Sequence, residues 1–88
     1  MIRRRVLVHG QVQGVFFRDT TRRLAVQRGI AGWVRNRADG AVEAVFEGEE
    51  EAVQALLRFC ENGPSGASVE RLETFEEQGE GLTGFRVV

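Results

Sequence analysis

The apolar residues of the chain follow two periods, and the change from one period to the other marks the expected elements. Short β-branched or aromatic runs bounded by glycine and turn residues are typical of strands. Five segments have this character: residues 4–10, 30–36, 41–48, 69–77 and 85–88. Apolar residues three and four positions apart instead predict helices over residues 17–28 and from Glu49 to Asn62. The order is therefore strand–helix–strand–strand–helix–strand, with one short extra strand.

The two expected helices each have one stripe of residues for the core. The first stripe consists of Phe17, Thr21, Leu24, Ala25 and Arg28. The second consists of Val53, Leu56, Leu57 and Cys60. Gly29 follows the first helix, at the position where a residue with left-handed backbone often ends a helix. The three glutamates at 49–51 are favourable at the start of the second helix, where the helix dipole is positive.

This order of elements predicts an α+β fold, the ferredoxin-like βαββαβ sandwich. We expect one domain over residues 1–88, in which both helices cover one face of a four-stranded antiparallel sheet and a short C-terminal strand is added. The first two strands flank a helix and therefore run parallel, so their carboxyl ends lie at the same edge of the sheet. The loop from Gly10 to Arg18 and the strand end at Asn36 should then be neighbours.

Composition narrows the class of protein. The chain has 88 residues and a single Cys, which cannot form an internal disulfide, and it has no apolar run near the ~18 residues that cross a bilayer. We therefore expect a soluble, cytoplasmic protein. The net charge of -1 hides an asymmetry, because residues 1–40 hold nine Arg against two Asp and residues 41–88 hold three Arg against eleven Glu. This asymmetry suggests that the first half meets any anionic ligand.

The glycine-rich loop before the first helix has the composition of an anion site. Gly10 and Gly14 allow backbone N–H groups to converge, and the helix start adds unpaired donors. Arg18, in the first turn, can place two parallel N–H groups on one phosphate or carboxylate. The loop lacks the Gly-Lys-Ser/Thr of a P-loop and the glycine spacing of a dinucleotide site. By itself this pattern is weak, because most such connections bind nothing.

Two stretches of the chain resemble a known family. Residues 8–18, VHGQVQGVFFR, match the acylphosphatase signature [LIV]-x-G-x-V-Q-G-V-x-[FM]-R. A second family motif resembles residues 32–36, GWVRN, followed by Gly40, Val42 and Gly48 at the family spacing. Neither motif departs from the family pattern, and the resemblance extends over the whole chain in length and strand order.

The resemblance implies hydrolysis of small-molecule acyl phosphates to a carboxylate and inorganic phosphate, with no metal or organic cofactor. By position, Arg18 corresponds to the phosphate-binding catalytic arginine and Asn36 to the residue that holds the attacking water. The backbone amides implied to complete the phosphate site belong to Gln13, Gly14, Val15, Phe16 and Phe17.

Other interpretations of these residues stay open at the level of the sequence. Arg18 could pair with a surface carboxylate, Asn36 could be a turn former, and the chain could be an anion-binding module without activity. Asp19 is expected to serve the helix start and to be paired with the neighbouring Arg18. Binding of nucleic acid is disfavoured, because the strand at residues 41–47 is net acidic and has one aromatic residue. A small chain with both helices on one face is expected to be a monomer.

Overall fold

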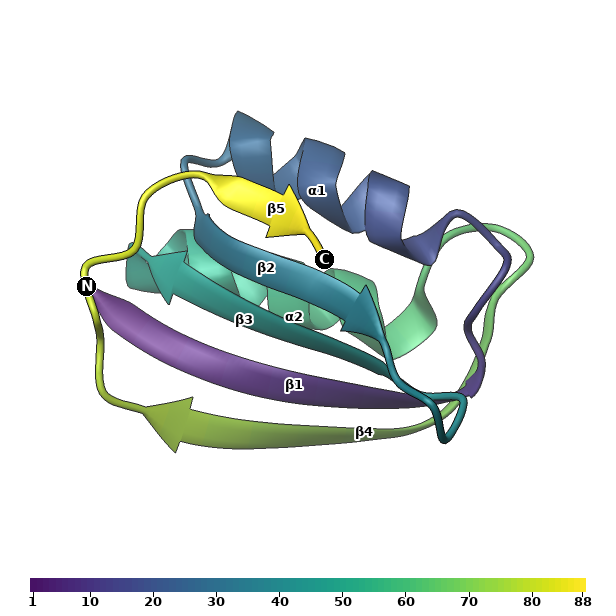
Figure 1. Ribbon diagram of the computed structural model, residues 1–88. Helices are drawn as coiled ribbons and strands as arrows, with labels where there is room; N and C mark the ends of the chain where they lie inside the picture. Colours follow the sequence, from purple (N-terminus) through teal and green to yellow (C-terminus); the bar gives the residue numbers. More distant parts are fainter.

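The computed structural model describes all 88 residues and contains five strands and two helices (Figure 1). In chain order they are β1 (Ile2–Gln11), α1 (Phe17–Gln27), β2 (Ala31–Asn36), β3 (Val42–Gly48), α2 (Glu50–Asn62), β4 (Ser68–Glu77) and β5 (Phe85–Val87). Every expected element is present, with ends shifted by one or two residues. Neither helix combines the length and apolar character needed to cross a membrane.

The strands form one sheet in the order β4-β1-β3-β2-β5. The pairs β1–β3, β1–β4 and β2–β3 are antiparallel, whereas β5 pairs parallel to β2. Since β3 lies antiparallel between them, β1 and β2 run in the same direction. Both helices pack against one face of the sheet, and the face turned toward the viewer in Figure 1 carries no helix. These features confirm the predicted ferredoxin-like fold.

The hydrophobic core fills the space between the helices and the sheet. It consists of Val6, Val8, Val12, Phe17, Ala25, Ile30, Val34, Val42, Ala44, Phe46, Val53, Leu56, Cys60 and Phe85. Phe46 of β3 stacks on Phe85 of β5 with ring centroids 5.9 Å apart, which anchors the short last strand. The prediction that Arg28 joins the core stripe of α1 is wrong: the helix ends at Gln27, and Arg28 is exposed at its C-terminal cap.

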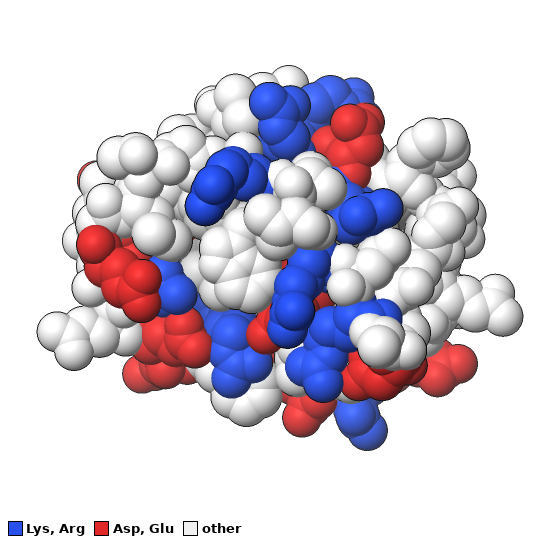
Figure 2. Space-filling view, viewed as in Figure 1, with Lys and Arg blue, Asp and Glu red and all other residues white.

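Ion pairs cover the helix-free face of the sheet, which we call the open face. Glu43 and Glu47 of β3 are buried there, with 6% of each residue exposed. Glu43 contacts Arg5 and Arg35 at 3.3 Å and 2.7 Å, and Arg3 and Arg5 both bond the carboxylate of Glu77 on β4. Figure 2 shows basic and acidic side chains interspersed across this face. Arginines of the first half of the chain thus form ion pairs with glutamates of the second half.

Candidate active site

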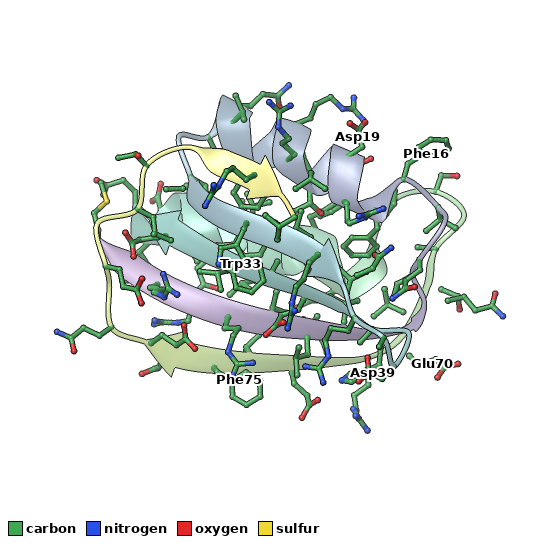
Figure 3. The ribbon with its side chains drawn as sticks, viewed as in Figure 1. Phe16, Asp19, Trp33, Asp39, Glu70 and Phe75 are labelled. Carbon is green, nitrogen blue, oxygen red and sulfur yellow. The ribbon has the colours of Figure 1, made fainter.

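A pocket of about 370 Å³ opens at the edge of the sheet where β1 and β2 end. Its lining consists of Val12, Gly14, Phe16, Phe17, Arg18, Asp19, Asn36 and Val87. The expected neighbours Arg18 and Asn36 therefore lie in the wall of the same pocket, although α1 separates them along the chain. In Figure 3, Phe16 and Asp19 lie at the start of α1 and Asp39 lies at the turn after β2, toward the same end of the sheet.

The loop that enters the pocket depends on left-handed backbone. Gly10 has a φ of 132° at a bulge in the pairing of β1 with β4, and a Cβ there would lie 2.2 Å from the Ser68 carbonyl oxygen. Gly14 and Phe16 follow with φ of 75° and 62°. Phe16 is the only residue other than glycine with a positive φ, and a left-handed phenylalanine is uncommon. Such conformations turn consecutive N–H groups toward one side of the chain, as in anion-binding nests.

The first turn of α1 has free donors. The N-terminal cap is Phe16, whose side chain accepts no N–H of the helix, so no side chain satisfies the first amides of α1. These amides and the positive end of the helix dipole favour an anion at this position. The site is therefore chemically suited to a phosphate or carboxylate group.

Arg18 is half-buried at this helix start and takes part in none of the ion pairs of the protein. Its guanidinium thus keeps its donors for a ligand. The expected pairing of Arg18 with Asp19 is wrong, because Asp19 lies 3.8 Å from Arg23 instead. Side chains four positions apart share a helix face, whereas adjacent ones do not.

Asn36 is the last residue of β2 and is half-buried. The turn that follows it is tightly bonded: the Arg37 N–H donates to the Ala41 carbonyl over 2.8 Å, and the Ala41 N–H donates to Asp39 Oδ1 over 3.1 Å. This second bond is the main reason that the pKa of Asp39 lies below its usual range, and Arg37 lowers the pKa further. The turn therefore holds Asn36 on a well-defined backbone.

One residue of the pocket wall and one contact beside the pocket were not predicted. Val87 forms part of the wall because β5 pairs with β2, with Val34 opposite Val87. Gln13, which was expected at the phosphate site, does not line the pocket, and its side chain donates to the carbonyls of Arg37 and Ala41 in the β2–β3 turn over 2.8 Å and 2.9 Å. No short-range pattern in the sequence indicates either contact.

His9 precedes the bulge and faces β4, where its Nε2 lies 2.7 Å from Glu73 Oε1. This hydrogen bond is the largest cause of the lowered pKa of Glu73. His9 does not line the pocket. No three His, Cys, Asp or Glu side chains of the protein are grouped as metal ligands are.

Comparison with known proteins identifies the family of this chain. The family model described as acylphosphatase matches residues 4–87. The acylphosphatase of Gloeobacter violaceus is 54% identical over 87 residues, which cover 99% of this chain and 94% of that relative. The acylphosphatase of Rubrobacter xylanophilus is 57% identical over 84 residues, 94% of this chain and 76% of that relative.

Solved structures agree with this assignment. The crystal structure of acylphosphatase from Bacillus subtilis superposes with a TM-score of 0.95 at 39% identity, covering 100% of this chain and 99% of that one. Sequence and fold thus match over nearly the full length of both chains, and the chain belongs to the acylphosphatase family.

Proposed function

We propose that the pocket beside Arg18 hydrolyses acyl phosphates to a carboxylate and inorganic phosphate. In this proposal Arg18 and the backbone N–H groups of residues 13–17 bind the phosphoryl group, and Asn36 orients the attacking water. The observation that carries the proposal is the position of Arg18, which is free of ion pairs and lines one pocket with Asn36 at an uncapped helix start. Membership of the acylphosphatase family supplies the reaction class.

The residues of the pocket suit the charge that develops in the reaction. The water oxygen forms a bond to phosphorus while the bond from phosphorus to the acyl oxygen breaks, and the carboxylate leaves with the electron pair. Negative charge is spread over three equatorial oxygens in this transition state, so positioning and charge stabilisation are the main tasks of the protein. The guanidinium of Arg18 and the uncapped N–H groups at the start of α1 provide both.

The leaving group removes the need for a general acid. A carboxylic acid has a pKa near ~4, so its anion departs without being protonated. The carboxamide of Asn36 has two donors and an acceptor and can hold a water molecule without taking its proton. We assign that proton to a phosphoryl oxygen of the substrate, which becomes inorganic phosphate.

We further propose that the protein acts as a single-domain monomer in the cytoplasm. The ion pairs that cover the open face support this, because they leave no broad apolar surface there for a second copy. The buried, unpaired Cys60 is consistent with a reducing compartment. Light scattering of the purified protein measures the oligomeric state directly.

The test of the activity is phosphate release from benzoyl phosphate by the purified protein in excess EDTA. We expect rapid turnover by the wild type and its near-complete loss in Arg18→Ala. Arg22→Ala is the matched control, because Arg22 lies one turn further along α1, is exposed and has no ion pair. Equal activity of folded Arg18→Ala and wild type would refute the site. No turnover by the wild type, with inorganic phosphate still bound, would leave an anion-binding module.

A further inference from the structure

The side chain of Gln13 lies outside the pocket lining and connects the loop between β1 and α1 with the turn that follows Asn36. It leaves the loop between β1 and α1, and its Nε2 donates to the carbonyl oxygens of Arg37 and Ala41 at 2.8 Å and 2.9 Å. The partners lie 24 and 28 positions further along the chain, beyond α1 and β2. Both N–H bonds of the carboxamide are therefore used within the protein, and the side chain has no donor left for a phosphoryl group.

The two accepting carbonyls belong to the residues that close the β2–β3 turn. The Arg37 N–H donates to the Ala41 carbonyl over 2.8 Å, and the Gly40 N–H donates to the Arg37 carbonyl over 3.1 Å. Arg37 directly follows Asn36, so a shift of the turn moves the peptide that carries Asn36. Asn36 is held on one side by its pairing with Val42 of β3, and Gln13 is bonded to the turn that follows it directly.

We infer that Gln13 is a positioning residue, which fixes Asn36 relative to the phosphate-binding loop through its two hydrogen bonds. This inference rests on the proposed function, in which the loop holds the phosphoryl group and Asn36 holds the water. Catalysis requires the water and the phosphorus to be aligned, and these two parts come from different elements. The sheet joins these two elements through its backbone, and the carboxamide of Gln13 joins them through a side chain.

The hydrogen bonds of the turn indicate that Gln13 positions Asn36 and is not needed for the turn to fold. Each accepting carbonyl keeps a second donor, Gly40 N–H for Arg37 and Arg37 N–H for Ala41. Loss of the Gln13 amide thus leaves no carbonyl of the turn without a partner, and the turn can form without it. The expected damage is loss of alignment, because displacements of about 1 Å at reacting groups can cost about 10²-fold in rate.

The first test uses Gln13→Met, which keeps the length of the side chain and removes both donors without adding charge. We expect kcat for benzoyl phosphate to fall by about 10–100-fold, with the inhibition constant of inorganic phosphate within about 3-fold of the wild type. Gln11→Met is the matched control, because Gln11 is exposed in the same segment and its side chain makes no hydrogen bond. We expect it to match the wild type in both constants.

The second test uses the pH dependence of Gln13→Glu. An ionised carboxylate only accepts hydrogen bonds and repels the two carbonyl oxygens, whereas a protonated one donates to one of them. We expect the ratio of its kcat to that of the wild type to rise as the pH falls from about 7 toward 4.5. The ratio for Gln11→Glu, which adds the same charge at an exposed position, should stay flat.

The outcomes distinguish this inference from the proposed function. A wild type without turnover would refute the function itself. An active wild type with unchanged kcat in folded Gln13→Met would overturn the role of Gln13. A fall in kcat accompanied by an equal loss of phosphate binding would overturn it too, because Gln13 would then shape the phosphate site and not its alignment with Asn36.

Discussion

Glu47 is a nearly buried carboxylate that fastens the crossover loop, residues 78–84, between β4 and β5. Its two oxygens accept the backbone N–H groups of Glu80 and Leu82, each over 2.7 Å, and Arg3 Nη1 lies 3.7 Å away. The hydrogen bond from Glu80 is the largest cause that lowers the pKa of Glu47 below its ordinary 4.5, with burial acting against it. Because β5 follows this loop directly, Glu47 adds to the stacking of Phe85 on Phe46 and the pairing with β2 in holding the last strand.

The substitution Glu47→Gln keeps one acceptor and turns the other oxygen into a donor that faces a backbone N–H. One charge-assisted hydrogen bond is lost, which costs about 1.5–3 kcal/mol, and an unsatisfied N–H adds to this. We expect a loss of about 2–3 kcal/mol in the free energy of unfolding. For a domain of this size such a loss lowers Tm by roughly 8–24 °C.

The assay is urea unfolding followed by the fluorescence of Trp33, the only tryptophan of the chain. Glu80→Gln is the control, because that side chain is 64% exposed and lies 3.7 Å from Arg3, so its pair should contribute at most about 1 kcal/mol. Equal losses in the two variants would refute the reasoning, since the bonds of Glu47 would then add nothing beyond a surface ion pair.

The pH dependence of the same experiment has a defined sign. The folded-state pKa of Glu47 is lowered, so the unfolded chain binds this proton more readily. The contribution of Glu47 to stability is complete above about pH 4.5 and is lost as the pH falls through the lowered folded value. The difference between the wild type and Glu47→Gln should therefore narrow in acid, and a difference that widened would contradict the assignment.

Three further predictions concern the pocket and the core. Asn36→Ala should lower kcat for benzoyl phosphate by about 10²-fold and leave phosphate inhibition nearly unchanged, because water alignment affects the transition state only; steady-state kinetics measure both. Gly32→Ala should lose about 1–3 kcal/mol more in urea unfolding than Gly81→Ala, because a Cβ at Gly32 lies 1.9 Å from the Val45 carbonyl oxygen and one at Gly81 meets open space. Burial raises the pKa of Cys60 to about 12, so a thiol reagent should react only after unfolding in urea.

The order of elements could be predicted because apolar period is a local property of the sequence. The exact residues at which helices and strands begin and end were harder to predict. β1 begins at Ile2, ahead of the predicted start, because Arg3 and Arg5 occupy strand positions on the open face, where glutamates neutralise them. Charged residues at such positions hide the alternation by which a strand is recognised.

The sequence predicts those parts of the pocket that follow from the parallel direction of β1 and β2. β1 and β2 end at the same edge, so the meeting of Arg18 with Asn36 follows from topology. Val87 enters the same wall from the end of the chain, through the parallel pairing of β5 with β2. The carboxamide of Gln13 contacts the β2–β3 turn from a loop that contains left-handed residues at Gly14 and Phe16. The positions of Val87 and of the Gln13 side chain both depend on contacts between segments far apart in the sequence, which no local sequence pattern indicates.

The strand order explains what becomes of the charge asymmetry between the two halves of the sequence. β1 lies between β3 and β4, so its arginines at positions 3–5 meet glutamates of both strands, and Arg35 meets Glu43. These pairs neutralise much of the positive first half against the acidic second half. The arginines of the first half that remain outside ion pairs are Arg18, Arg22 and Arg28, all in or at the end of α1.

A protein with a net charge of -1 can therefore present a locally positive site to an anion. The unpaired guanidinium nearest the loop amides is that of Arg18, where the dipole of α1 adds its own positive end. Attraction of an anion to this pocket thus depends on which arginines the sheet leaves unpaired, and not on the total charge of the first half. The ion pairs of the open face and the pocket proposed to bind phosphate are two consequences of the same strand order.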